Sequence, residues 1–305
     1  MSAILVSGLI NVEVTLRVDG FPIEYTPVRY PFFGVEGTIS GVGYNIAKAL
    51  TTLGDQVHLL SMVGQDLAGK LSREALAVDG IGQEFVVDAM PHTSRSVILY
   101  DGEGRRQINV DLKDIQERSY PPHLFRRAIA GCDMVALCNI NFSRPFLDQA
   151  RQLGVPIATD VHTIGDLEDD YNQDFMAAAD VLFMSDEALP CTPEEWIQAV
   201  MARYRPQVVV IGLGAEGALL AVRENHFVGR VPAVRTRPIV NTIGAGDALF
   251  SSFIHFYRRT QDPHTSLRKA VVFASYKIGE AGAADGFLDE AGLDTLYAEV
   301  TAADS

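Results

Sequence analysis

Short apolar runs alternate with stretches of helical spacing along most of this 305-residue chain, and this alternation constrains the fold more than any other feature. The runs lack the strict two-residue alternation of a half-exposed strand, so they are typical of strands buried on both faces. Strands that alternate with helices form right-handed βαβ units and a parallel sheet between two helical layers. The sequence therefore predicts a three-layer α/β/α sandwich with a mainly parallel sheet. Strands are expected at Ala3–Ile10, Val57–Val63, Met134–Ile140, Pro156–Val161, Val181–Met184 and Val208–Ile211, with helices between them such as Arg144–Leu153 and Thr192–Tyr204.

Two regions break this rhythm. In Ser94–Val110, the pair Asp101-Gly102 separates two runs that alternate apolar and polar residues, which indicates a β-hairpin. Asn11–Thr38 carries β-branched residues interrupted by prolines and has no helical period. We expect residues of about 11–38 and 94–110 to form one small antiparallel β-lid over a site; the alternative is two surface hairpins without a role. With no linker or internal repeat, residues 1–305 are predicted to form a single domain that ends in a helix.

Composition excludes several classes of partner. The formal net charge is −14 and Lys and Arg do not cluster, so nucleic acid and anionic membranes are not expected partners. No apolar stretch reaches the ~18 residues that span a bilayer, and the first residues lack a basic segment, so we expect a cytoplasmic protein. The three cysteines have no C-x-x-C spacing, which argues against a disulfide framework or a zinc site.

The strongest chemical signal is the loop Asn241–Asp247 (N-T-I-G-A-G-D), which precedes a helical stripe. A helix start presents unpaired N–H groups, and Gly244 and Gly246 leave room for an anion such as phosphate. Asp247 falls in the first helical turn, where a carboxylate can take a proton from an attacking hydroxyl. The alternative is that Asp247 only complements the helix dipole and that the glycines only make a tight turn. The stripe consists of Leu249, Phe250, Phe253, Ile254 and Tyr257.

A second glycine-bearing loop, Thr38–Ala47 (T-I-S-G-V-G-Y-N-I-A), opens an amphipathic stretch. Gly41 and Gly43 allow a polyol to approach the backbone closely. Asn45 offers a donor and an acceptor to sugar hydroxyls, which need both.

Together these segments resemble the two signatures of the ribokinase-like (pfkB) carbohydrate kinases, G-x-G-x-N-x-A near the N-terminus and T-x-G-A-G-D near the C-terminus. The resemblance covers nearly the whole chain, in order and in distance. It includes an opening strand followed by Gly8 and Asn11, the hairpin, and the elements L-G-D-x-V at Leu53–Val57 and V-G-x-D-x-x-G at Val63–Gly69.

The resemblance implies a sandwich with a β-lid that binds ATP and Mg²⁺ and transfers the γ-phosphoryl group to a hydroxyl. Asp247 matches the general base, and the backbone amides of Gly244, Ala245 and Gly246 match the anion hole. The residues implied in sugar binding are Asn11, Glu13, Gly41, Asn45 and Asp247.

The segment Gly212–Gly217 satisfies G-x-G-x-x-G after a strand, but the sequence does not predict a dinucleotide site there. A second apolar run, a turn and a third run follow it, where a Rossmann fold requires a helix. Resemblance instead places this loop at the ATP site; a plain tight turn is the alternative. The residues assigned to the nucleotide are Ser185, Gly212, Gly214, Gly217 and Gly246.

Four positions in three motifs depart from the family pattern. Glu13 stands where Asp is usual, which lengthens that side chain by one methylene. The nucleotide-side N-x-x-E motif has Ser185 and Ala188 in place of Asn and Glu, so either Glu187 helps to order Mg²⁺ through water or the phosphates hold the metal. Asn241 replaces an Asp near a monovalent-cation site, and we therefore predict weak or absent activation by potassium.

The leading interpretation is a sugar kinase. A nucleoside kinase of the same family is an alternative, favoured if Phe32, Phe33 and Tyr100 face the site. A catalytically silent sugar-binding regulator is another, suggested by the altered metal motif. The sequence does not identify the sugar or the hydroxyl.

Other charged and titratable residues have weaker signals. Arg105 and Arg106 on the hairpin either reach an anionic group of the substrate or form an exposed pair, and we favour the exposed pair. His162 and His255 have no metal-ligand spacing and receive no chemical role. The resemblance also makes a homodimer through the lid a prediction.

Overall fold

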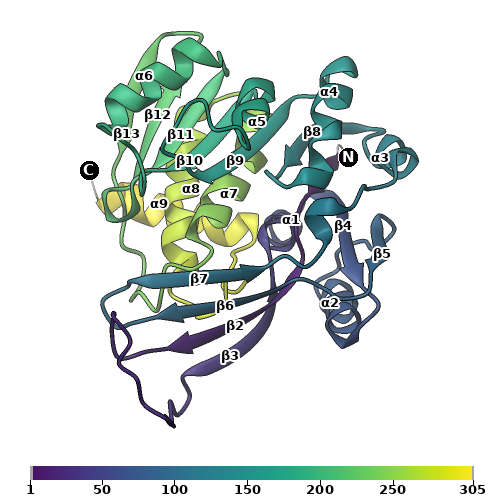
Figure 1. Cartoon of the computed structure of the whole chain (residues 1–305). Helices are drawn as coiled ribbons and strands as arrows, with labels where there is room; N and C mark the ends of the chain where they lie inside the picture. Colours follow the sequence, from purple (N-terminus) through teal and green to yellow (C-terminus); the bar gives the residue numbers. More distant parts are fainter. Residues whose placement is uncertain (1–2, 304–305) are drawn as a thin grey trace.

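The computed structural model describes residues 3–303 and places them in two sheets with flanking helices (Figure 1). The large sheet has nine strands in the order β13-β12-β11-β10-β9-β8-β1-β4-β5. The strands from β11 to β5 in this order are parallel, and β12 and β13 add an antiparallel edge. The strands are β1 (Ala3–Ser7), β4 (Gln56–Gly64), β5 (Val86–Met90), β8 (Cys132–Leu137), β9 (Ile157–Thr163), β10 (Val181–Ser185), β11 (Val208–Gly212), β12 (Ala218–Val222) and β13 (Phe227–Val231).

Helices cover both faces of the large sheet. Leu5 of β1 packs into the core under α3 to α6, whereas its neighbours Ile4 and Val6 pack under α1, α7 and α8. Consecutive residues of one strand are therefore buried on opposite faces, which is why the runs in the sequence are apolar without alternation. The three-layer α/β/α prediction is confirmed. The helices are α1 (Val42–Thr52), α2 (Leu67–Val78), α3 (Pro122–Ala128), α4 (Pro145–Gln152), α5 (Gln173–Ala178), α6 (Pro193–Arg203), α7 (Ala245–Thr260), α8 (Pro263–Lys277) and α9 (Glu290–Ala303).

The strand predicted at Ala3–Ile10 is shorter in the structure. The chain leaves the large sheet after Ser7, and a Cβ added to Gly8 would lie 2.6 Å from Sγ of Cys138 and 2.7 Å from Cα of Gly43. This close approach brings the end of β1 against the start of α1. The expected C-terminal helix is present as α9; the last two residues of that expectation lie outside the described part of the chain.

The lid is a separate four-stranded sheet in the order β3 (Val35–Ser40), β2 (Asn11–Arg17), β6 (Arg95–Tyr100) and β7 (Arg106–Asp111). The predicted hairpin at Ser94–Val110 is confirmed as β6 and β7. The fully antiparallel lid was wrong, because β2 and β6 pair in parallel. β2 directly follows β1 along the chain, and β6 directly follows β5. Because β1 and β5 run parallel in the large sheet, β2 and β6 leave that sheet in the same direction.

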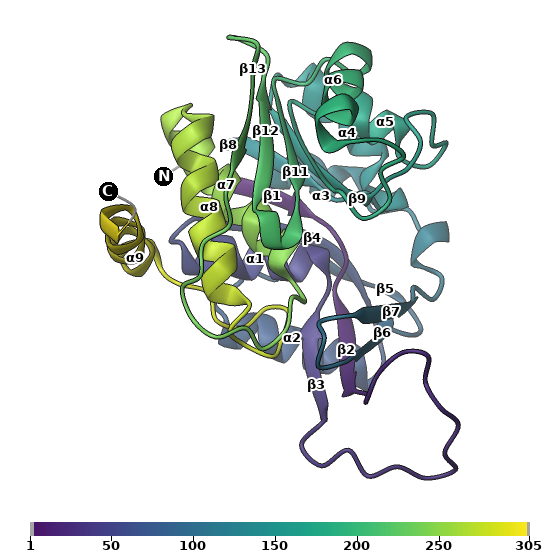
Figure 2. The same cartoon turned by 90° about the vertical axis from the view of Figure 1, so that its left-hand side faces the viewer.

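The lid lies against the body of the molecule and carries one extended loop. Ile98 of β6 is buried in contact with Ile243 and Ala283, next to the start of α7. The loop between β2 and β3 projects away from the body in Figure 2, with Phe32 and Phe33 84% and 102% exposed. Among residues 3–303, no helix has both the length and the apolar composition needed to cross a bilayer. That the chain forms a single domain stays a prediction.

Candidate active site

Asp247 lies in the first turn of α7, and the local backbone needs glycine to put it there. Gly244, the residue before the helix, has φ of 76°, in the left-handed region. A Cβ at Gly244 would also lie 2.2 Å from the carbonyl oxygen of Ala283, so only glycine fits this turn. Apolar residues of α7 then pack under the large sheet and fix the helix. The carboxylate of Asp247 is partly buried at the helix N-terminus, as predicted.

The two glycine loops recognised in the sequence meet at a hydrogen bond between their polar side chains. Nδ2 of Asn45, in the first turn of α1, donates to Oδ2 of Asp247 at 2.7 Å. Oδ1 of Asn45 accepts from Oγ of Ser40 at 3.3 Å, which orients the amide. Gly41 has φ of 103°, and a Cβ there would lie 2.6 Å from the carbonyl oxygen of Leu9. The structure thus brings together residues 202 positions apart in the sequence.

The surroundings of Asp247 place its proton affinity in a range useful for catalysis. Burial raises the pKa of this carboxyl, whereas the hydrogen bond from Asn45 and the positive charges of His162 and Lys277 oppose the rise. The negative charge of Asp160 adds to it. A carboxylate with a raised pKa is a stronger base than one in water, so Asp247 is suited to accept a proton near neutral pH.

The inner face of the lid presents polar atoms without partners. Asn11 and Glu13 of β2 are 3% and 5% exposed. Oδ1 of Asn11, Oε1 of Glu13 and Oγ1 of Thr38 are buried with no hydrogen-bond partner among the described residues. Glu13 lies opposite both Thr38 and Ser96 in the strand register, so these groups share one face. Glu13 also interacts with Asp247 through its charge. Because buried polar groups in proteins are normally paired, three unpaired oxygens on this lid face fit a ligand with hydroxyl groups.

The anion loop, residues 241–247, faces open space at Gly246. This glycine is exposed, and the nearest atom to a Cβ placed on it would be Oδ2 of Asp160, at 4.0 Å. The N–H of Ala245 donates to the carbonyl of Thr242 at 3.3 Å, a long bond that closes the turn. Of the three amides assigned to the anion hole, the one at Ala245 therefore already has a backbone acceptor.

Asp160 and His162 are site residues that the sequence reasoning missed. Both lie near the carboxyl end of β9, and His162 has φ of 58°, which turns the chain there. Oδ1 of Asp160 accepts from the backbone N–H of His162 at 2.8 Å, and Nδ1 of the histidine ring lies 3.6 Å from Oδ2. The sequence did contain a signal for these residues, because both lie near the end of a predicted strand, and ligands in open α/β sheets bind beyond the carboxyl ends of the strands.

The nucleotide-side residues lie at the carboxyl ends of neighbouring strands. Ser185 of β10 pairs with Gly212 of β11. A tight turn at Gly214–Glu216 then leads into antiparallel β12, as predicted from the sequence, so no Rossmann unit forms. Gly217 has φ of 98°, and a Cβ there would lie 2.1 Å from the carbonyl oxygen of Val231.

The two basic residues of the lid, Arg105 and Arg106, have different partners. Arg105 stays in its own hairpin, where it pairs with Asp101 at 2.8 Å and Glu103 at 3.0 Å. Arg106 reaches across to the body and pairs with Glu187 at 3.0 Å. Glu187 is therefore occupied by a guanidinium in this arrangement. Arg106 is exposed, as favoured from the sequence, but it also contacts the body of the molecule; its reach to a substrate anion stays a prediction.

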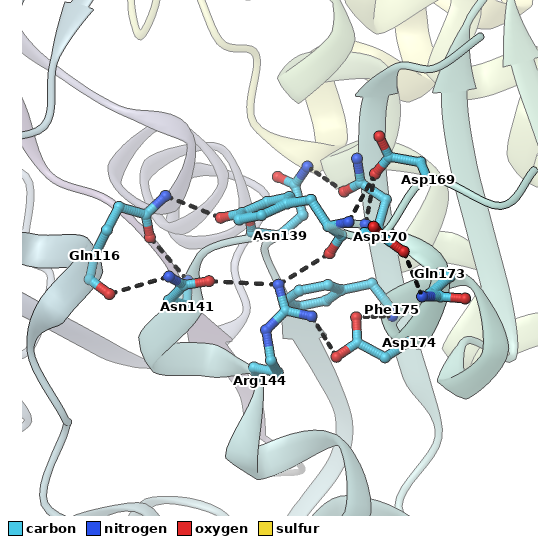
Figure 3. A network of polar contacts seen from close by, with 11 residues as sticks. Gln116, Asn139, Asn141, Arg144, Asp169, Asp170, Gln173, Asp174 and Phe175 are labelled. Atoms are coloured by element: carbon cyan, nitrogen blue, oxygen red, sulfur yellow. Dashed lines mark hydrogen bonds and ion pairs between the residues drawn. The ribbon is translucent and has the colours of Figure 1, made fainter. Parts of the chain in front are cut away.

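A polar network braces the loop after β8 against the loop after β9 (Figure 3). Gln116 accepts from the N–H of Asn141 at 3.1 Å, and Arg144 points toward Asp174 in the centre of the view. The guanidinium of Arg144 also lies 4.8 Å from the ring centroid of Phe175. This network ties the segment after β8, with Asn139 and Asn141, to the segment before α5.

The fold and the site together indicate a class of enzyme. A helix N-terminus with an exposed glycine, a carboxylate in its first turn, and a polar lid are an arrangement that suits a phosphotransferase of ribokinase-like architecture. A family model described as pfkB family carbohydrate kinase matches residues 1–290. The chain therefore belongs to the pfkB family of carbohydrate kinases and is an ATP-dependent carbohydrate kinase.

Curated relatives are similar over nearly their whole length. Acarbose 7(IV)-phosphotransferase of Actinoplanes sp. is 27% identical over 95% of this chain and 96% of its own. The ATP-dependent ribose-1-phosphate kinase of Halopiger xanaduensis is 28% identical over 93% and 94%. Among solved structures, the microbiome-derived acarbose kinase Mak1 is 27% identical, with a TM-score of 0.86 over 97% of this chain and 99% of its own. Ribokinase of Arabidopsis thaliana, 19% identical with a TM-score of 0.80 over 97% and 99%, shares the fold.

Proposed function

We propose that this kinase transfers the γ-phosphoryl group of ATP to a hydroxyl of a small, non-nucleoside carbohydrate, with Asp247 as the general base. One observation carries the proposal: Asn45 donates to the carboxylate of Asp247 at 2.7 Å, and Glu13, whose charge acts on Asp247, shares a lid face with buried oxygens that have no partner among the described residues. Hydroxyls both donate and accept, so a polyol can satisfy Asn11, Glu13 and Thr38 and still present one hydroxyl to Asp247.

In this mechanism each part of the site has one task. Asp247 takes the proton of the acceptor hydroxyl as that oxygen bonds to the γ-phosphorus and the bond to the bridging oxygen of ADP breaks. The amides of Gly244 to Gly246 and the dipole of α7 stabilise the charge on the transferring group. The lid excludes water and so favours transfer over hydrolysis of ATP.

The nucleotide and the metal follow from the family. We place the nucleotide along Ser185, Gly212, Gly214, Gly217 and Gly246. No group of three His, Cys, Asp or Glu side chains able to hold a metal occurs within residues 3–303. In kinases Mg²⁺ is commonly held by substrate phosphates and one or two carboxylates. Asp160, beside Gly246, would be such a carboxylate when Mg²⁺ is bound, and Glu187 another if Arg106 releases it. The metal supplies charge neutralisation at the phosphates.

The polarity of the lid favours a free sugar over a nucleoside. Phe32 and Phe33, which would contact a nucleobase if they faced the site, lie in the projecting loop and are almost fully exposed. Tyr100 lies on the same face of β6 as Ser96 and is half-buried, so it is the one of these three aromatic residues on the lid face that carries Glu13. Asn11 and Glu13 on that face are polar and buried. The intact Gly244–Asp247 loop argues against a silent regulator.

We also propose a homodimer through the outer face of the lid. In the strand register, Val97 of β6 and Val35 of β3 lie on the face opposite Glu13 and Ser96, and they are 43% and 56% exposed. Apolar side chains on an exposed sheet face are a typical protein contact.

ADP release from MgATP is the measurement that tests the function. A panel would contain hexoses, pentoses, sugar acids, sugar phosphates, oligosaccharides and nucleosides, with Asp247→Asn as the control. We expect turnover with a non-nucleoside sugar that is lost in the variant. Turnover with nucleosides alone would select the alternative kinase, and sugar binding without any turnover would select the regulator.

A further inference from the structure

Lys277, the last residue of α8, is buried completely. Its side chain is 0% exposed and ranks among the largest fully buried side chains of the protein. Lysine is almost never fully buried unless its charge is compensated. Nζ of Lys277 donates to the carbonyl oxygen of Ile243 in the anion loop. A buried cation thus lies directly behind the loop that we assign to the phosphoryl group.

The charges that face this ammonium come from several segments. Asp247 of α7, Glu13 of β2 and Asp285, which follows α8, favour the charged form of Lys277, and the guanidinium of Arg237 opposes it. Burial is the largest influence and lowers the pKa of Lys277 to about 8. The ammonium is therefore mostly protonated at neutral pH, and its positive charge acts on Asp247.

Both backbone groups of Ile243, its N–H and its carbonyl, form hydrogen bonds. Oδ1 of Asn241 accepts from the N–H of Ile243 at 2.9 Å, and Nδ2 of the same amide donates to the carbonyl of Ala281 at 2.8 Å. The ammonium of Lys277 donates to the carbonyl of Ile243. That carbonyl shares a peptide plane with the N–H of Gly244, and in a trans peptide the two groups point in opposite directions. A donor fixed on the carbonyl therefore directs the N–H of Gly244 toward the other side of the loop and polarises it.

We propose that Lys277 is a positioning residue and the internal cation of the anion loop: its ammonium orients the Ile243–Gly244 peptide toward the transferring phosphoryl group. This inference rests on the proposed function of that loop. It also gives a physical reason for the predicted independence from potassium, because the ammonium of Lys277 already supplies a positive charge to this carbonyl.

The test compares Lys277→Met, which removes the charge and keeps most of the volume, with Lys269→Met on the same helix as the matched control. We expect kcat of Lys277→Met to fall by about 10²-fold, the size of loss found when one oxyanion donor is removed, with KM for sugar and ATP within a few-fold. Because Lys277 lowers the pKa of Asp247, the acid limb of the pH profile should move to higher pH in this variant. A role in folding alone would not move that limb.

Chemical rescue gives a second readout. Lys277→Ala leaves a space behind Ile243, and ammonium or methylammonium at fixed ionic strength should restore part of kcat in this variant while leaving the unmodified protein unchanged. Retention of kcat within about threefold in Lys277→Met, or activation of the unmodified protein by potassium of about tenfold or more, overturns the inference. If Lys277→Met does not fold, Lys277→Gln, which is neutral and can still donate to Ile243, takes its place.

A third readout does not require turnover. Carbon-13 NMR of the Asp247 carboxyl measures its pKa in the unmodified protein and in Lys277→Met. An upward displacement supports the inference, and an unchanged pKa overturns it, even if no acceptor in the panel is phosphorylated. In that last case the proposed function fails separately, because the unmodified protein itself shows no turnover.

Discussion

Nη1 of Arg106, on lid strand β7, donates to Oγ1 of Thr242 in the anion loop at 2.7 Å. The same guanidinium pairs with Glu187 after β10, and the apolar contact of Ile98 with Ile243 lies on the same side of the lid. The lid thus contacts the anion loop directly, through both a polar and an apolar contact. We therefore expect closure of the lid to depend on these contacts.

Loss of this polar contact should weaken lid closure. We expect Arg106→Ala to lower kcat/KM for the sugar by about fivefold, which corresponds to about 1 kcal/mol, the upper range for exposed ion pairs. Hydrolysis of ATP without acceptor should rise, since an open lid admits water. Coupled assays of sugar phosphate and ADP formation measure both. Arg105→Ala, which removes only contacts within the hairpin turn, is the control and should behave as the unmodified protein.

Removal of the base should affect chemistry and spare binding. Asp247→Asn keeps an oxygen that can accept from Asn45, so the local hydrogen bond persists. We expect kcat to fall by ~10²–10⁴-fold with little change in sugar and nucleotide affinity. Steady-state kinetics and calorimetric titration check this. Asp148→Asn, in the first turn of α4, tests whether loss of any helix-terminal carboxylate has the same effect; a loss in turnover of similar size there would contradict the assignment.

The pH dependence of turnover should report Asp247. Burial raises its pKa to about 6, and only the ionised carboxylate accepts a proton, so kcat/KM should fall as the pH drops through about 6. His162 lowers this pKa, so His162→Asn should move the acid limb to higher pH. Asparagine tolerates the left-handed backbone found at this position. His123→Asn, on exposed α3, should leave the profile in place, and an acid limb unmoved by His162→Asn would argue against this coupling.

The unpaired carboxylate oxygen of Glu13 on the lid should affect kinetics with the sugar and not with ATP. Glu13→Gln keeps the shape and removes the charge, and a charged hydrogen bond to a buried group contributes about 1.5–3 kcal/mol. We expect kcat/KM for the sugar to fall by roughly 10- to 100-fold with KM for ATP unchanged. Glu74→Gln, exposed on α2, provides the baseline. Equal losses for both substrates would point instead to a general disturbance of the lid.

The sequence predicted the parts of the site that local motifs encode. Asn45 and Asp247 each follow a glycine loop at a helix start. Every helix start presents unpaired backbone N–H groups, so this property can be predicted from the local sequence. The sequence alone did not predict that the two loops would meet. Their direct hydrogen bond is a finding of the structure.

The remaining features depend on tertiary packing, which a local motif does not encode. Lys277 ends an ordinary amphipathic helix, and nothing in its neighbours indicates complete burial. Arg106 contacts residues 81 and 136 positions away, so its role depends on how the lid docks. The parallel pairing of β2 with β6 likewise follows from the positions of β1 and β5 in the large sheet, not from the alternation within either strand.

The outer face of the lid leads to the last prediction. Val97 lies in the middle of β6, 43% exposed, on the face away from Glu13. If two lids pair through this face, Val97→Lys places two like charges in an apolar contact and should shift the protein to a monomer. Sedimentation equilibrium across a range of concentrations measures the change. Val78→Lys, 81% exposed at the end of α2, is the control and should leave assembly unchanged. A monomeric unmodified protein at all concentrations would contradict the dimer, whereas loss of sugar affinity in Val97→Lys together with dissociation would show that pairing holds the lid in its closed position.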